Sequence, residues 1–584
     1  MVKLPDSGSV LDVHYGVDPA LDALLLHFTT ENNIEYFTDP QENAPPEQVR
    51  FIVALDENAF YAPCSDWMFW QLLRSQPSHE LFLEYLRQWR TVVDLARERV
   101  ADPYLRRRII ALLRHKFRLA LGNCIFIPSR LLKRMLTIFM AQSGLDDPSR
   151  ESRQRRNLQA AGVLGARAWD RALNVCPAEQ FACQRLGDLR FELDFLEFRR
   201  LVCLSAMQLT LAAADPETAC AQAVAECEAE AGAFEPLRGL LGFGEQSLRI
   251  LFLPEGSGNI LFDAELLRCL IRQGHRVVLA LKEGFYFDAP LFWDPEHDPE
   301  LARALHGARF VPEVRVSKNE LLRAMAESPL LVISDGTRER FNPYRTSVTF
   351  ARAWKEADLV IAKGEEHYRR LVQTSHEFTR DILCYFRDQS GHLHLHFKPK
   401  AEWVRKFSES DIRAKAEAII EGMRRARSEG RTVMFYSAII GSIPGQVKVA
   451  VEVVTTFVEY LRTRLENAYI INPGEHFEEG MDADDLMYMW EKVQRSGFIN
   501  VWRFQSTQDI EKSFELLGRK VPPVWAGKDA TYSTGCTKEM HIALDLQKKT
   551  PELQIIGPNP EQFFRRREYG VGKFCDVAVD DCGA

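Results

Sequence analysis

The sequence lacks several features that would each define a class of protein. Its twelve cysteines are scattered singly, with no CxxC pair, which argues against a zinc ribbon, and a chain of 584 residues needs no disulfide framework. No uninterrupted apolar run reaches membrane-spanning length. The stretch MVKLPDSGSV at the N-terminus lacks the basic and apolar blocks of a signal peptide. We therefore expect a cytoplasmic protein with no membrane partner, whose thiols are mostly buried and reduced.

An excess of positive charge is also missing. The net charge is -8 and the pI is about 6.0, so the chain has no global attraction to nucleic acid or to an anionic membrane. Charged residues make up 27% and hydrophobic residues 46%, an ordinary globular composition. The length suffices for two to four domains, each with its own core. Small or neutral partners fit this composition better than nucleic acid does.

Residues 1–245 are predicted to form a helical domain. Long periodic stretches are broken at Pro103 and Pro128, and strand alternation is missing. Basic residues crowd the segment from Arg87 to Arg134. They form either a basic surface for an anionic partner or a solvated helix face, and the acidic net charge favours the solvated face.

The pattern changes at residue 246 to that of an α/β protein. The apolar runs RILFL, HRVVLAL, LLVIS and DLVIA alternate with helices, which predicts a Rossmann-like αβα domain with a parallel sheet over residues 246–405. The segment HLHLHF would place three histidines on one face of a strand, either as metal ligands or, as we favour, on an exposed edge strand. A helical linker over 406–430 leads to an additional C-terminal α/β domain over 431–584, with expected strands in TVMFYSAII, AYIIN, INVWRF, VPPVW and LQIIG.

Polar residues follow four successive expected strands of the Rossmann-like domain. In a parallel sheet these carboxyl ends meet at one edge, where ligands bind. Carboxylates suit a hard cation, and lysine and glycine suit a phosphoryl group, so the coincidence indicates an anionic ligand held with a divalent cation. The residues concerned are Glu255-Gly256-Ser257-Gly258-Asn259, then Lys282 and Asp288, then Ser334-Asp335-Gly336, and finally Lys363-Gly364-Glu365-Glu366-His367.

Two of these segments resemble the damage-control phosphatase family, long called domain of unknown function 89. The segment ILFLPEGSGNILFDAELLRCLIRQGHRVVLALKEGFYFD is similar to the family's first signature, a strand ending in Asp-Asn-x-Gly-Glu followed by a further Asp and then a strand ending in lysine and Asp. The segment ADLVIAKGEEHYRRL resembles the second signature in the acidic-residue methyltransferase-like subgroup. The resemblance covers roughly residues 1–400.

The resemblance implies a metal-dependent phosphatase acting on small phosphorylated metabolites. By matching positions, Glu255, Asp288 and Asn259 would bind a divalent cation such as Mn²⁺, Mg²⁺, Co²⁺ or Ni²⁺. Lys363 would neutralise developing charge, and Asn259 or Asp335 would orient the attacking water. The predicted phosphate-binding residues are Ser257, Gly258, Lys363, Gly364, Glu365 and His367, and Asp263 keeps the identity found in the family.

Two leading ligand positions depart from the family pattern. Glu255 stands where the family has Asp, and Gly256 stands where it has Asn and offers no side-chain ligand. An alternative is therefore a catalytically degenerate ligand-binding or assembly protein that keeps the fold. A further alternative, associated with the subgroup, is an S-adenosylmethionine-dependent carboxyl methyltransferase.

The C-terminal block lies outside the resemblance. Cys536 lies at an expected helix start beside Lys538, where a thiol pKa is lowered, so it is a candidate reactive thiol. The threonines around it are equally good helix caps. The loop Gly441–Gln446 could hold an anion but lacks the ending of a P-loop. The block could restrict the substrate, cover the crevice or recruit a protein partner.

Overall fold

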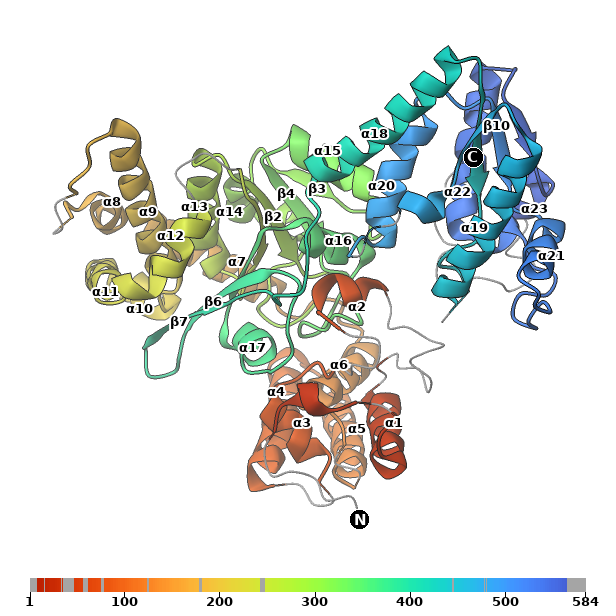
Figure 1. The fold of residues 1–584 in the computed structure, drawn as a ribbon. Coiled ribbons are helices and arrows are strands. Elements are labelled where there is room, and N and C mark those ends of the chain that lie inside the picture. Colours follow the sequence, from red (N-terminus) through yellow and green to blue (C-terminus); the bar gives the residue numbers. More distant parts are fainter. Residues whose placement is uncertain are drawn as a thin grey trace. The chain divides into compact units, whose positions relative to one another are not determined.

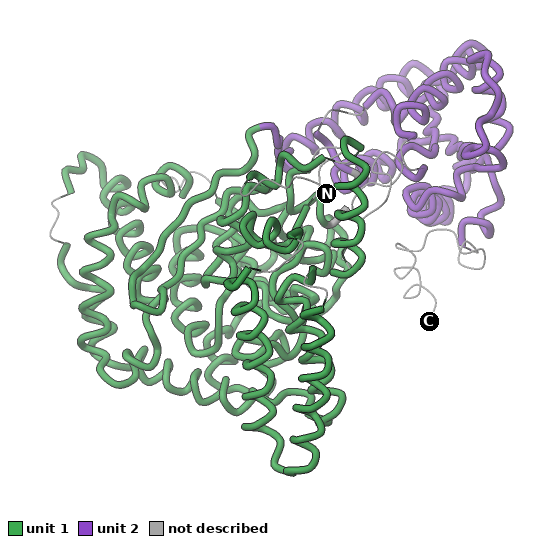
Figure 2. The backbone as a smooth tube through the Cα atoms, turned by 90° about the horizontal axis from the view of Figure 1, so that it is seen from below, with its two compact units in different colours: residues 1–38, 45–402 green, residues 39–44, 403–584 purple. Residues whose placement is uncertain are grey.

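The computed structural model describes residues 8–14, 16–32, 34, 47–55, 61–74, 78–122, 125–177, 181–241, 247–443, 446–476, 478 and 480–564. Its contacts divide the chain into two compact units (Figure 2). Unit 1 comprises residues 1–38 and 45–402, and unit 2 comprises residues 39–44 and 403–584. The expected helical and Rossmann-like domains fall in unit 1 except for residues 39–44 and 403–405, which belong to unit 2 together with the expected linker and C-terminal domain.

Unit 1 begins with the predicted helices (Figure 1). Pro103 and Pro128 each stand in the first turn of a helix, where the N–H that proline lacks would have no helical partner. The helices are α1 (Pro19–Asn32), α2 (Glu47–Ile52), α3 (Asp66–Leu72), α4 (His79–Arg99), α5 (Pro103–Leu121), α6 (Pro128–Ser143), α7 (Arg150–Leu164), α8 (Arg167–Asn174), α9 (Leu186–Ser205), α10 (Leu209–Ala214), α11 (Pro216–Ala229) and α12 (Glu235–Leu241).

These helices pack in two groups with different cores. Apolar side chains of α1 and α3 to α6 form one core, which also receives Phe285 from the segment after the second strand. Side chains of α7 to α12 join the core of the sheet itself, where Trp169 stacks on Phe262 at a centroid distance of 5.2 Å. The first group therefore packs against the segment that follows β2, and the second group packs against the sheet.

The sheet of unit 1 has the order β3-β4-β2-β1-β5-β6-β7, and its first six strands are parallel. The Rossmann-like expectation is confirmed by the four quoted apolar runs, all of which are strands. The strands are β1 (Arg249–Leu253), β2 (Arg276–Leu281), β3 (Arg309–Val311), β4 (Leu330–Ser334), β5 (Leu359–Lys363), β6 (Asp381–Arg387) and β7 (Leu393–Lys398). Between them lie α13 (Asn259–Arg272), α14 (Pro299–Ala304), α15 (Lys318–Glu327), α16 (Val348–Glu356), α17 (Glu365–His367) and a π-helical turn, Tyr368–Val372.

The histidine-bearing strand β7 is the edge strand that we favoured, and it pairs antiparallel with β6. His394 and His396 lie on one face with parallel rings, and His394 is 2.9 Å from the Asp388 carboxylate. His392 precedes the strand. The described residues form no group of three His, Cys, Asp or Glu that could hold a metal ion, here or elsewhere.

Unit 2 is a smaller α/β unit with a four-stranded parallel sheet of order β11-β10-β8-β9. The prediction of a strand in VPPVW is wrong: none of residues 521–525 is in a strand and residues 523–527 form turns, because Pro522 and Pro523 have no N–H to donate to a neighbouring strand. The elements are α18 (Glu409–Ser428), β8 (Thr432–Ser437), α19 (Val447–Arg464), β9 (Ala468–Ile471), α20 (Ala483–Gln494), β10 (Val501–Phe504), α21 (Thr507–Leu516), α22 (Thr534–Lys549), β11 (Gln554–Ile556) and α23 (Pro560–Phe564).

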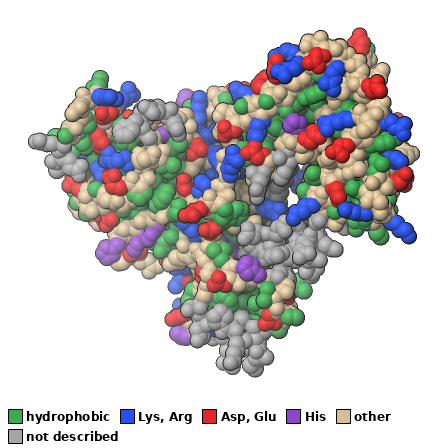
Figure 3. Space-filling model, viewed as in Figure 1, with side chains coloured by type: hydrophobic (Ala, Val, Ile, Leu, Met, Phe, Trp, Pro, Cys, Tyr) green, Lys and Arg blue, Asp and Glu red, His purple; other side chains and the backbone are tan. Residues whose placement is uncertain are grey.

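The surface carries both signs of charge. Figure 3 shows lysine and arginine side chains interspersed with aspartate and glutamate over the visible face. Among the described helices, none combines the length and the apolar character that crossing a membrane would require.

Candidate functional site

The strand order of unit 1 places its switch point between β1 and β5. From β1 the chain continues to β2 on one side, whereas β5 pairs with the other side of β1. The helices that follow the two strands therefore leave a crevice between their carboxyl ends, which is the usual ligand position in such sheets. Glu255 follows β1 and Gly364 follows β5. A Cβ at Gly364 would lie 2.9 Å from Glu255 Cγ, so these two predicted site residues are in contact.

A buried ion pair lies under this contact. Lys363 Nζ donates to Asp263 Oδ1 at 2.6 Å and to the carbonyl of Ser205 at 2.8 Å, and both charged side chains are fully buried. Burial raises the pKa of Asp263 to about 6, although Lys363 acts to lower it. Lys363 thus anchors the end of β5 to α13 and α9 from below. It contributes positive charge to the crevice without reaching its surface.

Glu255 follows β1 and His367 follows β5, so both lie at this edge of the sheet. Solvent reaches the Glu255 side chain, yet surrounding protein raises its pKa, with Glu365 adding to the rise and Lys363 opposing it. His367 is partly exposed, and burial lowers its pKa to about 4. Its Nδ1 lies 2.8 Å from the carbonyl of Lys363, which can only accept a hydrogen bond. The imidazole is therefore neutral near pH 7, with Nδ1–H as donor and Nε2 as a hydrogen-bond acceptor.

The turn between β1 and α13 is held tightly by its neighbours. Ser257 N donates to the carbonyl of Asp288 at 2.7 Å, and Gly258 N donates to Asn157 Oδ1 at 2.5 Å. Gly258 has φ +83°, and a Cβ there would lie 2.4 Å from Leu209 Cδ2. Only glycine fits this position. The predicted phosphate-binding turn has thus already committed two of its amides to protein acceptors.

Two polar side-chain atoms of the same turn have no hydrogen-bond partner. Ser257 Oγ and Asn259 Oδ1 are both buried atoms without a partner, and the Ser257 residue is only 5% exposed. Buried polar atoms in folded proteins are normally paired, so each such atom needs an explanation. A ligand group or water that donates hydrogen bonds would satisfy both.

Asp288 carries an arginine where the sequence analysis expects a metal ion. Arg156 Nη1, from α7, lies 2.6 Å from Asp288 Oδ2, and both side chains are close to half exposed. Gly256 has no side-chain ligand, and the described residues form no three-ligand group of His, Cys, Asp or Glu. The donor set around Glu255, Asp288 and Asn259 therefore does not fit a divalent cation, and Arg156 brings a solvent-accessible positive charge to this edge.

The other predicted residues lie nearby but are engaged with protein groups. Asp335 is 7% exposed and accepts hydrogen bonds from Lys282 Nζ at 2.6 Å and from Thr337. It therefore shapes the loop after β4. Glu365 pairs with Arg369 at 2.7 Å on the surface of the turn after β5.

Cys536 lies in unit 2, in the first turn of α22. It is 2% exposed, and its Sγ donates to the carbonyl of Ala438 at 3.4 Å. The nearby Glu539 carboxyl accepts a hydrogen bond from Gln494, and burial raises the pKa of Glu539 to about 7. The thiol is therefore enclosed beside a buried carboxyl, away from solvent reagents.

The residues of the site that the sequence did not predict are arginines, from both the helices and the loops of unit 1. Arg156 reaches the sheet edge from α7, and Arg340 from the loop after β4 contacts Tyr286 and Glu366 at 3.1 and 2.9 Å. Arg130 belongs to the basic segment that we interpreted as a solvated face, yet it lines a pocket together with Arg340 and Arg370. The uncapped start of α6 at Pro128 was the only signal of that pocket in the sequence.

Among three comparisons with known proteins, the one with solved structures found matches. No protein-family model matches this sequence, and no curated protein matches it. Among solved structures, the chain is similar to the crystal structure of a DUF89 family protein from Pyrococcus horikoshii. The identity is 19%, the match covers 54% of this chain and 92% of that chain, and the TM-score is 0.35. Over about half its length, the chain matches a DUF89 family structure.

Proposed function

We propose that unit 1 binds a small phosphorylated metabolite at the β1/β5 edge of its sheet, as a phosphatase-like protein that does not depend on a metal ion. The observation that carries the proposal is the set of unsatisfied acceptors at this edge. Asn259 Oδ1 and Ser257 Oγ are buried without partners, and His367 Nε2 has no hydrogen-bond partner among the described residues.

The ligand needs both hydroxyl groups and negative charge. Hydroxyl groups of a sugar or polyol would donate to Glu255, Asn259 Oδ1 and His367 Nε2. A phosphoryl group would bind the Arg156 guanidinium. This group forms an ion pair with Asp288 and has further N–H donors for a ligand. A phosphorylated polyol combines these two requirements, whereas a free polyol or free phosphate meets only one.

Calorimetric titration with fructose 6-phosphate in the presence of EDTA tests the proposal. We expect binding that is roughly tenfold weaker in Arg156→Gln, because a charge-assisted hydrogen bond is lost. Arg155→Gln is the matched control: it removes the same charge from the neighbouring, exposed position of α7, to which the described residues offer no ion pair. Fructose alone and inorganic phosphate alone should bind more weakly than the phosphorylated sugar.

A phosphate-release assay with Mn²⁺, Mg²⁺, Co²⁺ and Ni²⁺ tests the competing function. Metal-dependent release that disappears in Asp288→Asn would overturn the proposal in favour of a metal-dependent phosphomonoester hydrolase. Equal affinity of Arg156→Gln and the unsubstituted protein would refute the role of Arg156.

A further inference from the structure

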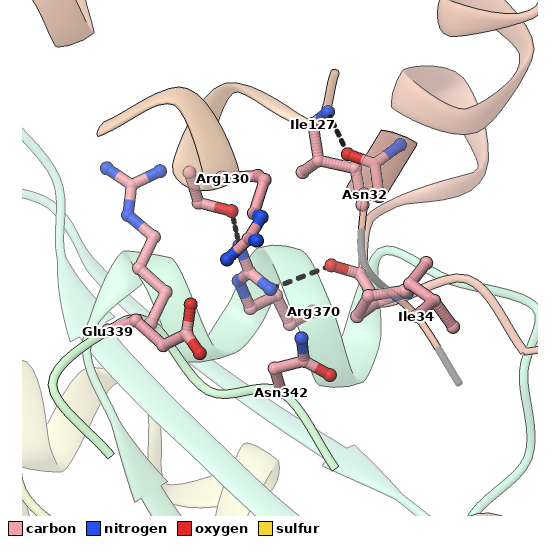
Figure 4. A pocket seen from close by; sticks show the side chains of 10 residues that line it. Asn32, Ile34, Ile127, Arg130, Glu339, Asn342 and Arg370 are labelled. Atoms are coloured by element: carbon pink, nitrogen blue, oxygen red, sulfur yellow. Dashed lines mark hydrogen bonds between the residues drawn. The ribbon is translucent and has the colours of Figure 1, made fainter. Parts of the chain in front are cut away.

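A second polar pocket of unit 1 lies between the start of α6 and the loops that follow β4 and β5. Its lining includes Arg130, Asn342 and Arg370. Figure 4 shows the Arg130 and Arg370 guanidinium groups close together in this space, with Asn342 beside them.

Arg370 is a buried cation held only by neutral groups. It is 7% exposed and donates to the carbonyls of Pro63 and Phe341 and to Ser129 Oγ, at 2.7, 2.8 and 2.7 Å. Among the described residues, no carboxylate lies within ion-pair distance of it. Burial and the neighbouring Arg340 lower the pKa of Arg370, while Glu366 acts to raise it. A buried guanidinium without a counter-charge is costly, so an anion bound beside it would stabilise it.

Arg130 shows the same lack of a counter-charge. Its Nε is buried without a hydrogen-bond partner, and the described residues provide no ion pair to its guanidinium. Burial lowers its pKa, and Arg134 and Arg345 lower it further, while Glu339 acts in the opposite direction. Glu339 is the acid that faces this pocket, and its carboxylate is already bound by Lys133 at 2.7 Å.

Two neutral donors complete the arrangement. The first turn of α6, a helix of 16 residues, has no side-chain cap, and Ser129 N has no acceptor among the described residues. The side chain of Asn342 uses its Oδ1 to accept from Tyr344 N at 3.1 Å, which leaves its amide N–H groups for a ligand. A helix N-terminus together with two arginines is a recurrent way to bind a tetrahedral oxyanion.

We propose that this arginine pocket, formed by Ser129, Arg130, Asn342 and Arg370, is a second anion site that binds a phosphoryl group. It goes beyond the sheet-edge site, because it uses none of the residues to which the metabolite is assigned there. Donors that come from a helix end, two guanidinium groups and an amide approach from several directions. This suits a tetrahedral phosphoryl group better than a planar carboxylate.

The first test is calorimetric titration of the full chain with inorganic phosphate in EDTA, alongside acetate as a carboxylate probe. Arg130→Gln is the informative variant, because the described residues offer the Arg130 side chain no hydrogen bond and its replacement relieves the repulsion from Arg134 and Arg345. We expect phosphate affinity to fall at least about tenfold while the melting temperature without phosphate stays equal or rises. Arg107→Gln removes the same charge from an exposed position on α5. It should change neither the phosphate affinity nor the melting temperature.

Three outcomes would overturn the proposal. The first is that millimolar phosphate does not bind the unsubstituted protein. The second is that acetate binds as tightly as phosphate, which would make the pocket a general anion site. The third is that Arg156→Gln, and not Arg130→Gln, removes phosphate binding, which would place the phosphate at the sheet edge. Loss of fructose 6-phosphate binding in Arg156→Gln with phosphate binding intact would support both sites separately. Loss of phosphate binding in Arg130→Gln while fructose 6-phosphate fails to bind would support the arginine pocket and refute the sheet-edge proposal.

Discussion

The carboxyl edges of the two parallel sheets are alike in topology and opposite in chemistry. In unit 1, the switch point between β1 and β5 carries Glu255, which is exposed, and His367, which is partly exposed. In unit 2, the corresponding switch point lies between β8 and β10. There Ser437, at the end of β8, accepts a hydrogen bond from Trp502, and Gln505, after β10, accepts from Ile439 N, and both polar residues are fully buried.

The two switch points differ in which of their polar groups are paired and in how far solvent reaches them. In unit 1, Ser257 Oγ and Asn259 Oδ1 are buried without partners, and Arg156 and Asp288 beside them are close to half exposed. In unit 2, Gln505 Nε2 is also buried without a partner, but Ser437 Oγ, Gln505 Oε1 and the Cys536 thiol of α22 are all paired with protein groups. The first edge therefore favours a charged ligand, whereas the second is part of a core.

The sharpest test of this contrast is the buried pair beneath the unit 1 edge. Lys363→Met would leave Asp263 buried without its partner, which we expect to cost about 3 to 5 kcal/mol of unfolding free energy. The measurement is urea denaturation of the full chain, with hydrogen exchange in β5 to locate the loss. Lys512→Met in unit 2 removes an exposed lysine paired with Glu515 and should cost about 0 to 1 kcal/mol.

A double variant, Asp263→Leu with Lys363→Met, should recover most of the lost stability, because no charge then remains buried. If Lys363→Met alone were as stable as the unsubstituted chain, the pair would not anchor the site.

In unit 2, the buried carboxyl of Glu539 should make stability depend on pH. Its folded pKa of about 7 lies above the ordinary value of 4.5. Its contribution is therefore complete below pH 4.5 and is lost as pH rises through 7, by about 3 kcal/mol. Denaturation at pH 5 and pH 8 should show this loss in the unsubstituted chain but not in Glu539→Gln. Equal pH dependence in both proteins would contradict the assignment.

Glycine substitutions should also destabilise the edge of unit 1 more than that of unit 2, with a smaller difference in unfolding free energy than the lysine variants. Gly364 has φ +110°, and its Cβ would meet Glu255, so Gly364→Ala should cost about 1 to 3 kcal/mol and weaken fructose 6-phosphate binding. Gly535 in the first turn of α22 has only ordinary neighbours, the nearest at 3.4 Å, so Gly535→Ala should change stability by less than about 0.5 kcal/mol. Thermal denaturation with titration checks both, and similar losses in the two variants would contradict the contrast.

The smallest effect concerns thiol reactivity. Cys536 is enclosed, whereas Cys176 is exposed. Alkylation of the native chain by iodoacetamide, followed by peptide mass spectrometry, should modify Cys536 at least about tenfold more slowly than Cys176. Rapid modification of Cys536 would show that the edge of unit 2 opens, and would restore the reactive thiol that the sequence suggested.

The sequence predicted the strands of both sheets where apolar runs were long and bounded by turn residues. Such runs as LLVIS need burial on both faces, which only a covered parallel sheet offers. Two strands escaped prediction: the short strand β3, in which Arg309 and Phe310 are exposed, and β6, although its apolar run ILCYF is buried. The prediction of a strand at VPPVW was wrong because it rested on the apolar residues and neglected that the two prolines have no N–H to donate.

Within the site, the sequence determined which residues follow each strand, and chain order alone places Glu255, Asp288 and Lys363 at the same edge. Only the tertiary structure decided what surrounds them. Arg156 arrives from a helix about 130 residues before Asp288, and Arg130 and Arg370 converge across 240 positions of chain. Ion pairing and burial depend on distances between such segments, which local patterns do not encode. The sequence therefore determined where a site could form, and packing decided that arginine, at both proposed sites, supplies the positive charge.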